Sequence, residues 1–164
     1  MKSIPSPFSI LLALTLFSLN SFFTVIPGRA AEPEEHTDAV SIMAFAESLF
    51  RDGQHYRAMI EHERFIYFNP KHPDTPKARY TIACAMQSTG NYTPAIALFT
   101  SLAEGYEGIV PGIESSFQKA ETFYLMHDFP SALKHYTQFL LRYPQHQLAE
   151  QARSAIEKIG KQSP

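Results

Sequence analysis

Residues 83–95, ACAMQSTGNYTPA, hold the pattern that decides the fold. Gly90 lies seven residues after Ala83 and five residues before Ala95. The same spacing occurs 37 residues earlier around Gly53 and 37 residues later around His127. The matching alanines are Ala46 and Ala58 in the first copy and Ala120 and Ala132 in the third. Six alanines at these positions would coincide by chance about once in half a million trials, which indicates an internal repeat.

The segments between the three turns have the periodicity of helices. Apolar residues recur at every third and fourth position, as in Val40, Met43, Ala46 and Leu49. Strand-like alternation with a period of two is absent, and turn residues interrupt the pattern at regular intervals. We therefore expect an all-α chain with six helices and a seventh over about residues 147–159.

The repeated alanines indicate close contact between the two helices of each unit. Only a small side chain fits where two helix backbones approach closely. Large apolar residues flank these positions: Leu49, Phe65, Met86, Leu102, Phe123 and Phe139. A single helix pair cannot bury its apolar face alone, so each unit has to stack on its neighbours.

The pattern Ala-x6-Gly-x4-Ala-x6-(Phe/Leu)-x4-Pro resembles the tetratricopeptide repeat (TPR) over about residues 41–159. The resemblance implies about three antiparallel helix pairs, stacked as a right-handed solenoid with a C-terminal capping helix. The period exceeds the family's usual 34 residues by three, which we assign to the loops between repeats. The Trp that is frequent in the first helix of this family is absent here.

The N-terminus has the pattern of an export signal. Residues 8–17, FSILLALTLF, are almost wholly apolar, and Gly28 and Ala30 suit a signal peptidase. We expect a signal peptide over 1–30, a flexible acidic lead over 31–39, the repeat domain over 40–159 and a disordered tail over 160–164. The alternative is an uncleaved membrane anchor, because residues 8–26 approach spanning length. The only cysteine is Cys84, so a lipid anchor that needs a cysteine after the apolar run is excluded.

Composition excludes several classes of protein. The formal net charge is −2, and it becomes −4 if cleavage removes Lys2 and Arg29, so a nucleic-acid binder is a poor hypothesis. One cysteine rules out an internal disulfide framework and a multi-cysteine zinc site. Apolar residues make up 45% of the chain, which is enough for a folded core.

The segments RFIYFNP (64–70) and QFLLRYP (138–144), together with the export signal and the long loops, narrow the resemblance. They are similar to the periplasmic repeats of BamD-like outer-membrane assembly lipoproteins and of Tol–Pal coordinator proteins. This likeness implies an envelope scaffold or adaptor. The missing lipid-attachment cysteine separates the chain from true members of the lipoprotein group.

The sequence offers no catalytic residues. It lacks a nucleophile elbow, a phosphate-binding glycine loop and a dinucleotide fingerprint. His55, Glu61 and His62 invite a metal hypothesis, but His62 occupies the position of Phe99 and Tyr136 in the other units and is more simply a packing residue. We therefore expect no enzyme activity, no metal and no cofactor.

The resemblance implies that the first helix of each unit lines a concave binding face. Transferred by register, that face comprises Met43, Glu47, Phe50, Tyr80, Cys84, Gln87, Phe117, Glu121 and Tyr124. The Lys, Asn and Arg residues that clamp a peptide carboxylate in some of these repeats are absent. Aromatic and Met anchors beside two carboxylates suit an apolar helix or an extended peptide with a basic residue. The alternative is that these residues pack against neighbouring helices.

The expected function is a non-catalytic protein-interaction scaffold, periplasmic or secreted, in envelope or outer-membrane assembly. Its partner would be a protein or peptide and not a nucleic acid. Two alternatives remain open: a chaperone-like holder of exported polypeptides, and an accessory regulator of a cell-wall enzyme.

Overall fold

A computed structural model of the chain describes residues 38–162, and these residues form helices only. The helices are α2 (Ala39–Arg51), α3 (His55–Phe68), α4 (Thr75–Ser88), α5 (Tyr92–Gly105), α6 (Gly112–Leu125), α7 (Phe129–Arg142) and α8 (Ala149–Gln162). The expected signal peptide and residues 31–37 of the expected lead lie outside the described residues. The expectation of an all-α array of helix pairs with a final single helix is confirmed.

The 37-residue period holds to the residue in the helix boundaries. Helices α3, α5 and α7 begin at positions 55, 92 and 129, and helices α4, α6 and α8 begin at 75, 112 and 149. Each pair is joined by a three-residue turn, and each pair is followed by a six-residue loop. Because the turns and the loops have identical lengths in all three copies, each unit presents the same faces to its neighbours.

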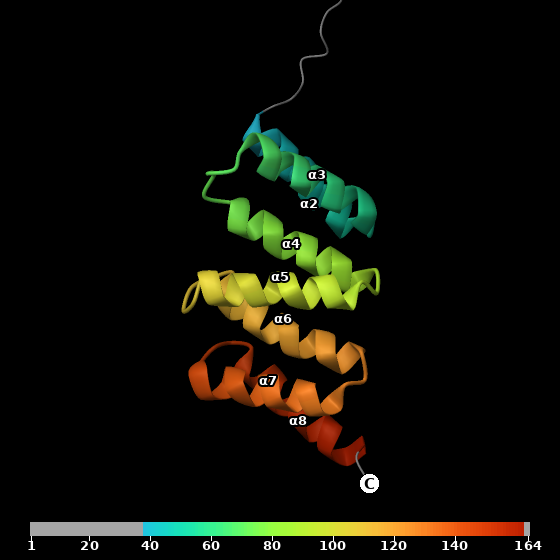
Figure 1. Ribbon diagram of the computed structural model, residues 1–164, viewed down its shortest axis with the longest axis vertical. Helices are drawn as coiled ribbons and strands as arrows, with labels where there is room; N and C mark the ends of the chain where they lie inside the picture. The colour runs from blue at the N-terminus through green and yellow to red at the C-terminus, as the bar shows by residue number, and fades with distance from the viewer. Residues whose placement is uncertain (1–37, 163–164) are drawn as a thin grey trace, which may run out of the picture. The chain divides into compact units, whose positions relative to one another are not determined.

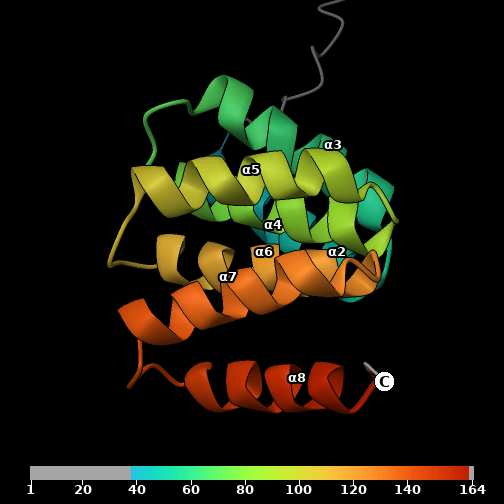
Figure 2. The same cartoon turned by 60° about the horizontal axis from the view of Figure 1, so that its bottom comes forward.

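Successive helices pack against each other along the whole array, as Figures 1 and 2 show. The first helices of neighbouring units also touch, since α4 contacts both α2 and α6. The first helices α2, α4 and α6 therefore form one layer, and the second helices α3, α5 and α7 cover it from the other side (Figure 1).

The turn inside each helix pair has one conformation in all three copies. Gly53, Gly90 and His127 have positive φ values of 73°, 79° and 60°. In the second unit the Gly90 N–H donates to the Gln87 carbonyl (3.1 Å), and the following N–H donates to the Met86 carbonyl (2.8 Å). These two bonds form a Schellman motif, which satisfies the last carbonyls of the first helix and reverses the chain.

The core is divided into clusters between consecutive helices. All six repeat alanines have no exposed surface, which fits the close helix contacts expected from the sequence. A further set of small residues, Ala78, Ser115 and Ala152, recurs at the same period and is also fully buried. These residues lie in the first helix of units two and three and in α8, and the sequence analysis did not identify their recurrence. Within residues 38–162, no helix is long and apolar enough to cross a membrane.

Two expected boundaries were wrong. Asp38 and Ala39 do not belong to a flexible lead, because the Asp38 carboxylate accepts from the Ser41 N–H (3.0 Å) and caps α2. The last helix does not end at 159 but continues to Gln162, so residues 160–162 are not a disordered tail. An ion pair between Lys161 and Glu157 (2.6 Å) stabilises that last turn, and Lys161 also complements the helix dipole.

Candidate functional site

We call the nine residues expected to bind a partner the first-helix stripe: Met43, Glu47, Phe50, Tyr80, Cys84, Gln87, Phe117, Glu121 and Tyr124. They occupy equivalent positions on α2, α4 and α6. Because these three helices contact one another in order, the stripe crosses them as neighbouring rows. Whether it binds a partner stays a prediction.

The apolar members of the stripe differ in exposure. Met43 is only 7% exposed and Phe117 only 4%, so the fold itself covers these two side chains. For them the packing alternative describes the structure better than partner contact. Phe50, Tyr80 and Tyr124 are half-buried and keep part of their surface open.

Ring contacts hold two of the open aromatics in place. The Tyr80 ring meets the edge of Phe99 from α5, with 5.9 Å between centroids. The Tyr124 ring lies 5.7 Å from that of Phe129 in α7. Burial also raises the pKa of Tyr80, so its hydroxyl stays protonated. These rings are pre-organised, which lowers the entropic cost of binding.

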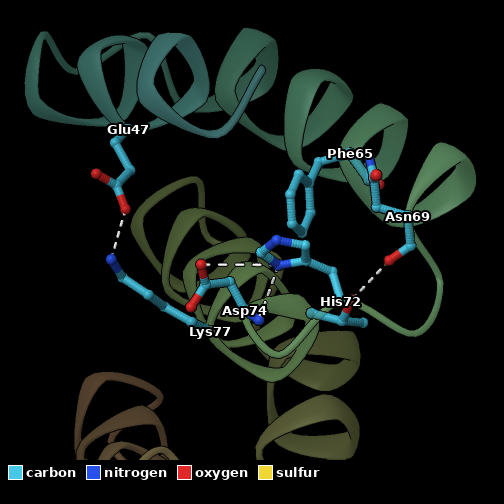
Figure 3. A network of polar contacts seen from close by, with 7 residues as sticks. Glu47, Phe65, Asn69, His72, Asp74 and Lys77 are labelled. Atoms are coloured by element: carbon cyan, nitrogen blue, oxygen red, sulfur yellow. Dashed lines mark hydrogen bonds and ion pairs between the residues drawn. The ribbon is translucent and has the colours of Figure 1, made fainter. Parts of the chain in front are cut away.

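Polar members of the stripe link neighbouring first helices. Glu47 of α2 pairs with Lys77 of α4, with Oε1 and Nζ 2.6 Å apart, as Figure 3 shows. The Gln87 amide of α4 donates to the Thr122 hydroxyl of α6 (2.9 Å). Hydrogen bonding to Glu47 raises the pKa of Lys77, so this ammonium stays charged. Glu47 and Gln87 therefore hold the layer of first helices together.

A carboxylate and a ring side chain occupy equivalent positions in units one and three, but they form a hydrogen bond only in unit three. In unit three the Tyr136 hydroxyl donates to the Glu121 carboxylate. The equivalent residues in unit one are His62 and Glu47, but in that unit Glu47 forms an ion pair with Lys77. His62 has no exposed surface and neither of its ring nitrogens has a hydrogen-bond partner among the described residues. Burial lowers the pKa of His62 to about 4, so the ring is neutral at pH 7.

The chemistry of the remaining candidates is limited. Burial raises the pKa of the Cys84 thiol to about 11, so it is protonated at neutral pH and a poor nucleophile. No group of three His, Cys, Asp or Glu side chains among residues 38–162 is placed to hold a metal ion.

A histidine in the loop after the first unit was missed by the sequence analysis. The His72 Nδ1 accepts from the Asp74 N–H (3.1 Å), and its ring packs edge-on against Phe65 at 5.2 Å (Figure 3). His146 lies two periods later, packs on Phe139 and accepts from the Leu148 N–H (3.3 Å). The 74-residue spacing of the two histidines was the signal that could have found this loop motif.

A cavity lies away from the stripe, between α5, α6 and α7. Its volume is about 530 Å³. Its charged and polar lining includes Glu104, Lys119, His135 and Arg142. Sequence reasoning could not find it, because these residues come from three helices and share no spacing.

Comparisons with solved structures identify the fold. A structure of the nearly identical TPR-like repeats of a putative kinesin light chain from Podosopora anserina superposes with a TM-score of 0.60. The fold is that of TPR-like repeats. The match has 15% sequence identity and covers 76% of this chain and 66% of that one. A second structure of the same repeats gives a TM-score of 0.59 at 15% identity, covering 77% of this chain and 67% of the other.

No protein-family model matches this chain, and no curated protein matches it. The TPR-like part spans about two thirds of the length of the two matched chains, and at 15% identity the likeness concerns the fold alone.

Proposed function

We propose that this protein is a non-catalytic scaffold that binds a protein partner along the first-helix stripe and acts in the cell envelope after export. The observation that carries the proposal is the set of half-buried aromatics Phe50, Tyr80 and Tyr124, one on the first helix of each of three packed units. Rigid aromatic side chains with open surface are the residues that contribute most to binding at protein interfaces.

The charge of the stripe favours a partner with a basic residue. Glu47 and Glu121 are its two charged members, and both are carboxylates. Glu47 keeps 38% of its side-chain surface exposed even when paired with Lys77. An apolar helix or extended segment carrying Lys or Arg would therefore complement the stripe.

The proposed location is supported by the apolar run at residues 8–17 and the small residues Gly28 and Ala30. N-terminal sequencing of the protein recovered from cells tests it. We expect the sequence Ala31-Glu32-Pro33-Glu34. A membrane-bound species that begins at Met1 would instead favour the uncleaved anchor.

Site-specific crosslinking tests the proposed surface. A photoreactive phenylalanine replaces Tyr124 in one variant, and it replaces Ala97, an exposed residue of α5, in the matched control. We expect one discrete partner to crosslink at position 124 and not at position 97. Crosslinks at position 97 alone, or the same products at both positions, would rule out the stripe. Many weak products at position 124 would favour the chaperone-like alternative over a scaffold with one partner.

A further inference from the structure

The cavity between α5, α6 and α7 has features of a binding site separate from the first-helix stripe. The second helices α5 and α7 both pack against α6, which belongs to the layer of first helices (Figure 1). None of the nine stripe residues lines the cavity. With a volume of about 530 Å³, it has the size of a site for a small ligand or a few side chains.

The lining of the cavity holds two cations, Lys119 and Arg142, and one carboxylate, Glu104. Lys119 projects from α6 and has no carboxylate within ion-pair distance among residues 38–162. Glu104 from α5 lines the same cavity, and Arg142 from α7 is already paired with Glu107 at 3.3 Å. Because the Lys119 ammonium makes no ion pair, its N–H groups can donate charge-assisted hydrogen bonds to one anionic group in the cavity.

The protonation behaviour of the basic groups agrees with this geometry. Burial lowers the pKa of Lys119; Glu104 opposes that shift and Lys134 adds to it. Burial also lowers the pKa of His135, and the nearby Lys119 and Lys134 lower it further. The positive charges of Lys119, Lys134 and protonated His135 repel one another, so a bound anion would stabilise the charged forms of these groups.

The other wall of the cavity is apolar. Phe139, Leu141 and Tyr143 line it beside Lys119, and Ala103 closes the α5 side. Leu141 is 79% exposed, an unusual fraction for a leucine on a helix, and it leaves apolar surface at the rim. A ligand that fits must combine one negative charge with an adjacent apolar side chain.

We propose that this cavity binds a carboxylate-bearing peptide segment, with the carboxylate on Lys119 and a neighbouring apolar side chain against Leu141 and Tyr143. A singly charged carboxylate can pair with Lys119 and is repelled less by Glu104 than a phosphate dianion would be. The carboxylate is either an Asp or Glu side chain or a peptide C-terminus, and the chemistry at Lys119 is the same for both.

Peptide titrations followed by amide NMR spectra of the mature protein test the proposal. The first probe, acetyl-Gly-Leu-Phe-Asp-Gly-amide, carries a side-chain carboxylate only. The second, acetyl-Gly-Leu-Phe-Asn-Gly with a free C-terminus, carries a terminal carboxylate only, and its amidated form is neutral. We expect one or both carboxylate peptides to shift resonances of α5, α6 and α7, and the neutral peptide to shift none. Equal shifts with the neutral peptide, shifts with inorganic phosphate alone, or no shifts would overturn the proposal.

Two cavity variants make the test specific, because one removes a positive charge and the other removes a negative charge. Lys119→Met should weaken binding of the carboxylate peptide by at least about tenfold, and Glu104→Gln should strengthen it by about threefold or more. Lys158→Met, at an exposed lysine of α8 outside the cavity, is the matched control and should leave the affinity unchanged. Glu104 is exposed, so Glu104→Gln reports even if Lys119→Met fails to fold. An affinity that neither cavity variant changes would overturn the proposal, whatever partner the first-helix stripe binds.

Discussion

At the scale of single residues, the turn inside each helix pair depends on one left-handed position. Gly53 and Gly90 fill it in two units, and His127 fills it in the third at φ 60°. A β-carbon added at Gly90 would meet no atom within 4 Å, so the preference for glycine there is conformational and not a matter of space. His127 holds a backbone conformation that costs an L-residue free energy.

We therefore expect His127→Gly to raise the free energy of unfolding by about 1 kcal/mol, and Gly90→Ala to lower it by a similar amount. Urea denaturation of the two variants and the wild type measures both effects. A loss of stability in His127→Gly would show that the contact of the His127 ring with Phe129, at 5.8 Å, outweighs the backbone cost.

The buried His62 gives the protein a dependence on pH. The ordinary pKa of histidine is 6.5, and burial lowers that of His62 to about 4 in the folded chain. Between these values the unfolded chain binds more protons than the folded one, so stability falls as the pH is lowered. At pH 5 this difference in proton binding lowers the free energy of unfolding by about 2 kcal/mol.

Replacing His62 with phenylalanine, the residue at the equivalent position 99, removes the titrating group and the unsatisfied nitrogens. We expect His62→Phe to be more stable than the wild type, by a margin about 2 kcal/mol larger at pH 5 than at pH 7.5. Thermal or urea unfolding at the two pH values measures the margin. An equal margin at both pH values would mean that folding does not lower the pKa of His62.

At the scale of helices, the repeated alanines set how closely the two members of a pair approach. Ala83 on α4 and Ala95 on α5 belong to one buried cluster with Phe99. Both alanines have no exposed surface, so a larger side chain there would have to displace the neighbouring helix.

Ala83→Leu should therefore overpack the contact between α4 and α5 and lower stability by roughly 1 to 3 kcal/mol. Ala97→Leu makes the same change at an exposed position of α5 and should alter stability by less than about 0.5 kcal/mol. Chemical denaturation compares the two. If both variants unfold like the wild type, Ala83 does not lie at a close helix contact.

The helices could be predicted from the sequence because their signals repeat. The spacing of Ala83, Gly90 and Ala95 occurs three times, and it gave the turns and the 37-residue period. Helix boundaries that do not repeat along the chain were harder to predict. The Asp38 cap of α2 and the extension of α8 to Gln162 each depend on a single local interaction that leaves no periodic trace.

The candidate site could be predicted in position but not in exposure. Register places Met43 and Phe117 in the same first-helix stripe as Phe50 and Tyr124, yet the first two are buried. Burial depends on which side chains the neighbouring helices supply, and one sequence does not show that. The cavity around Lys119 could not be predicted either, because its lining also comes from side chains of neighbouring helices.

At the scale of the whole array, the last helix closes the stack. The α8 residues Ala152 and Ile159 join the buried cluster of Tyr136 and Phe139, so α8 covers the end of the third pair. The opposite face of α8 is polar and exposed, with Glu150, Arg153 and Lys158. A terminal helix with one apolar and one polar face is what a repeat array needs to stay soluble.

We predict that this array binds its partner through the open aromatics of the first-helix stripe. The most direct measurement is the dissociation constant of the partner recovered by crosslinking at position 124, determined by calorimetry for wild type and for the double variant Tyr80→Ala/Tyr124→Ala. Truncating such aromatic anchors costs about 2 kcal/mol or more, so the double variant should bind at least about 30-fold more weakly while keeping its helicity. Lys134→Ala, at an exposed residue of α7, should leave the constant unchanged. Normal binding by the folded double variant, with loss of binding in Lys134→Ala, would contradict this prediction and place the partner on the second-helix side.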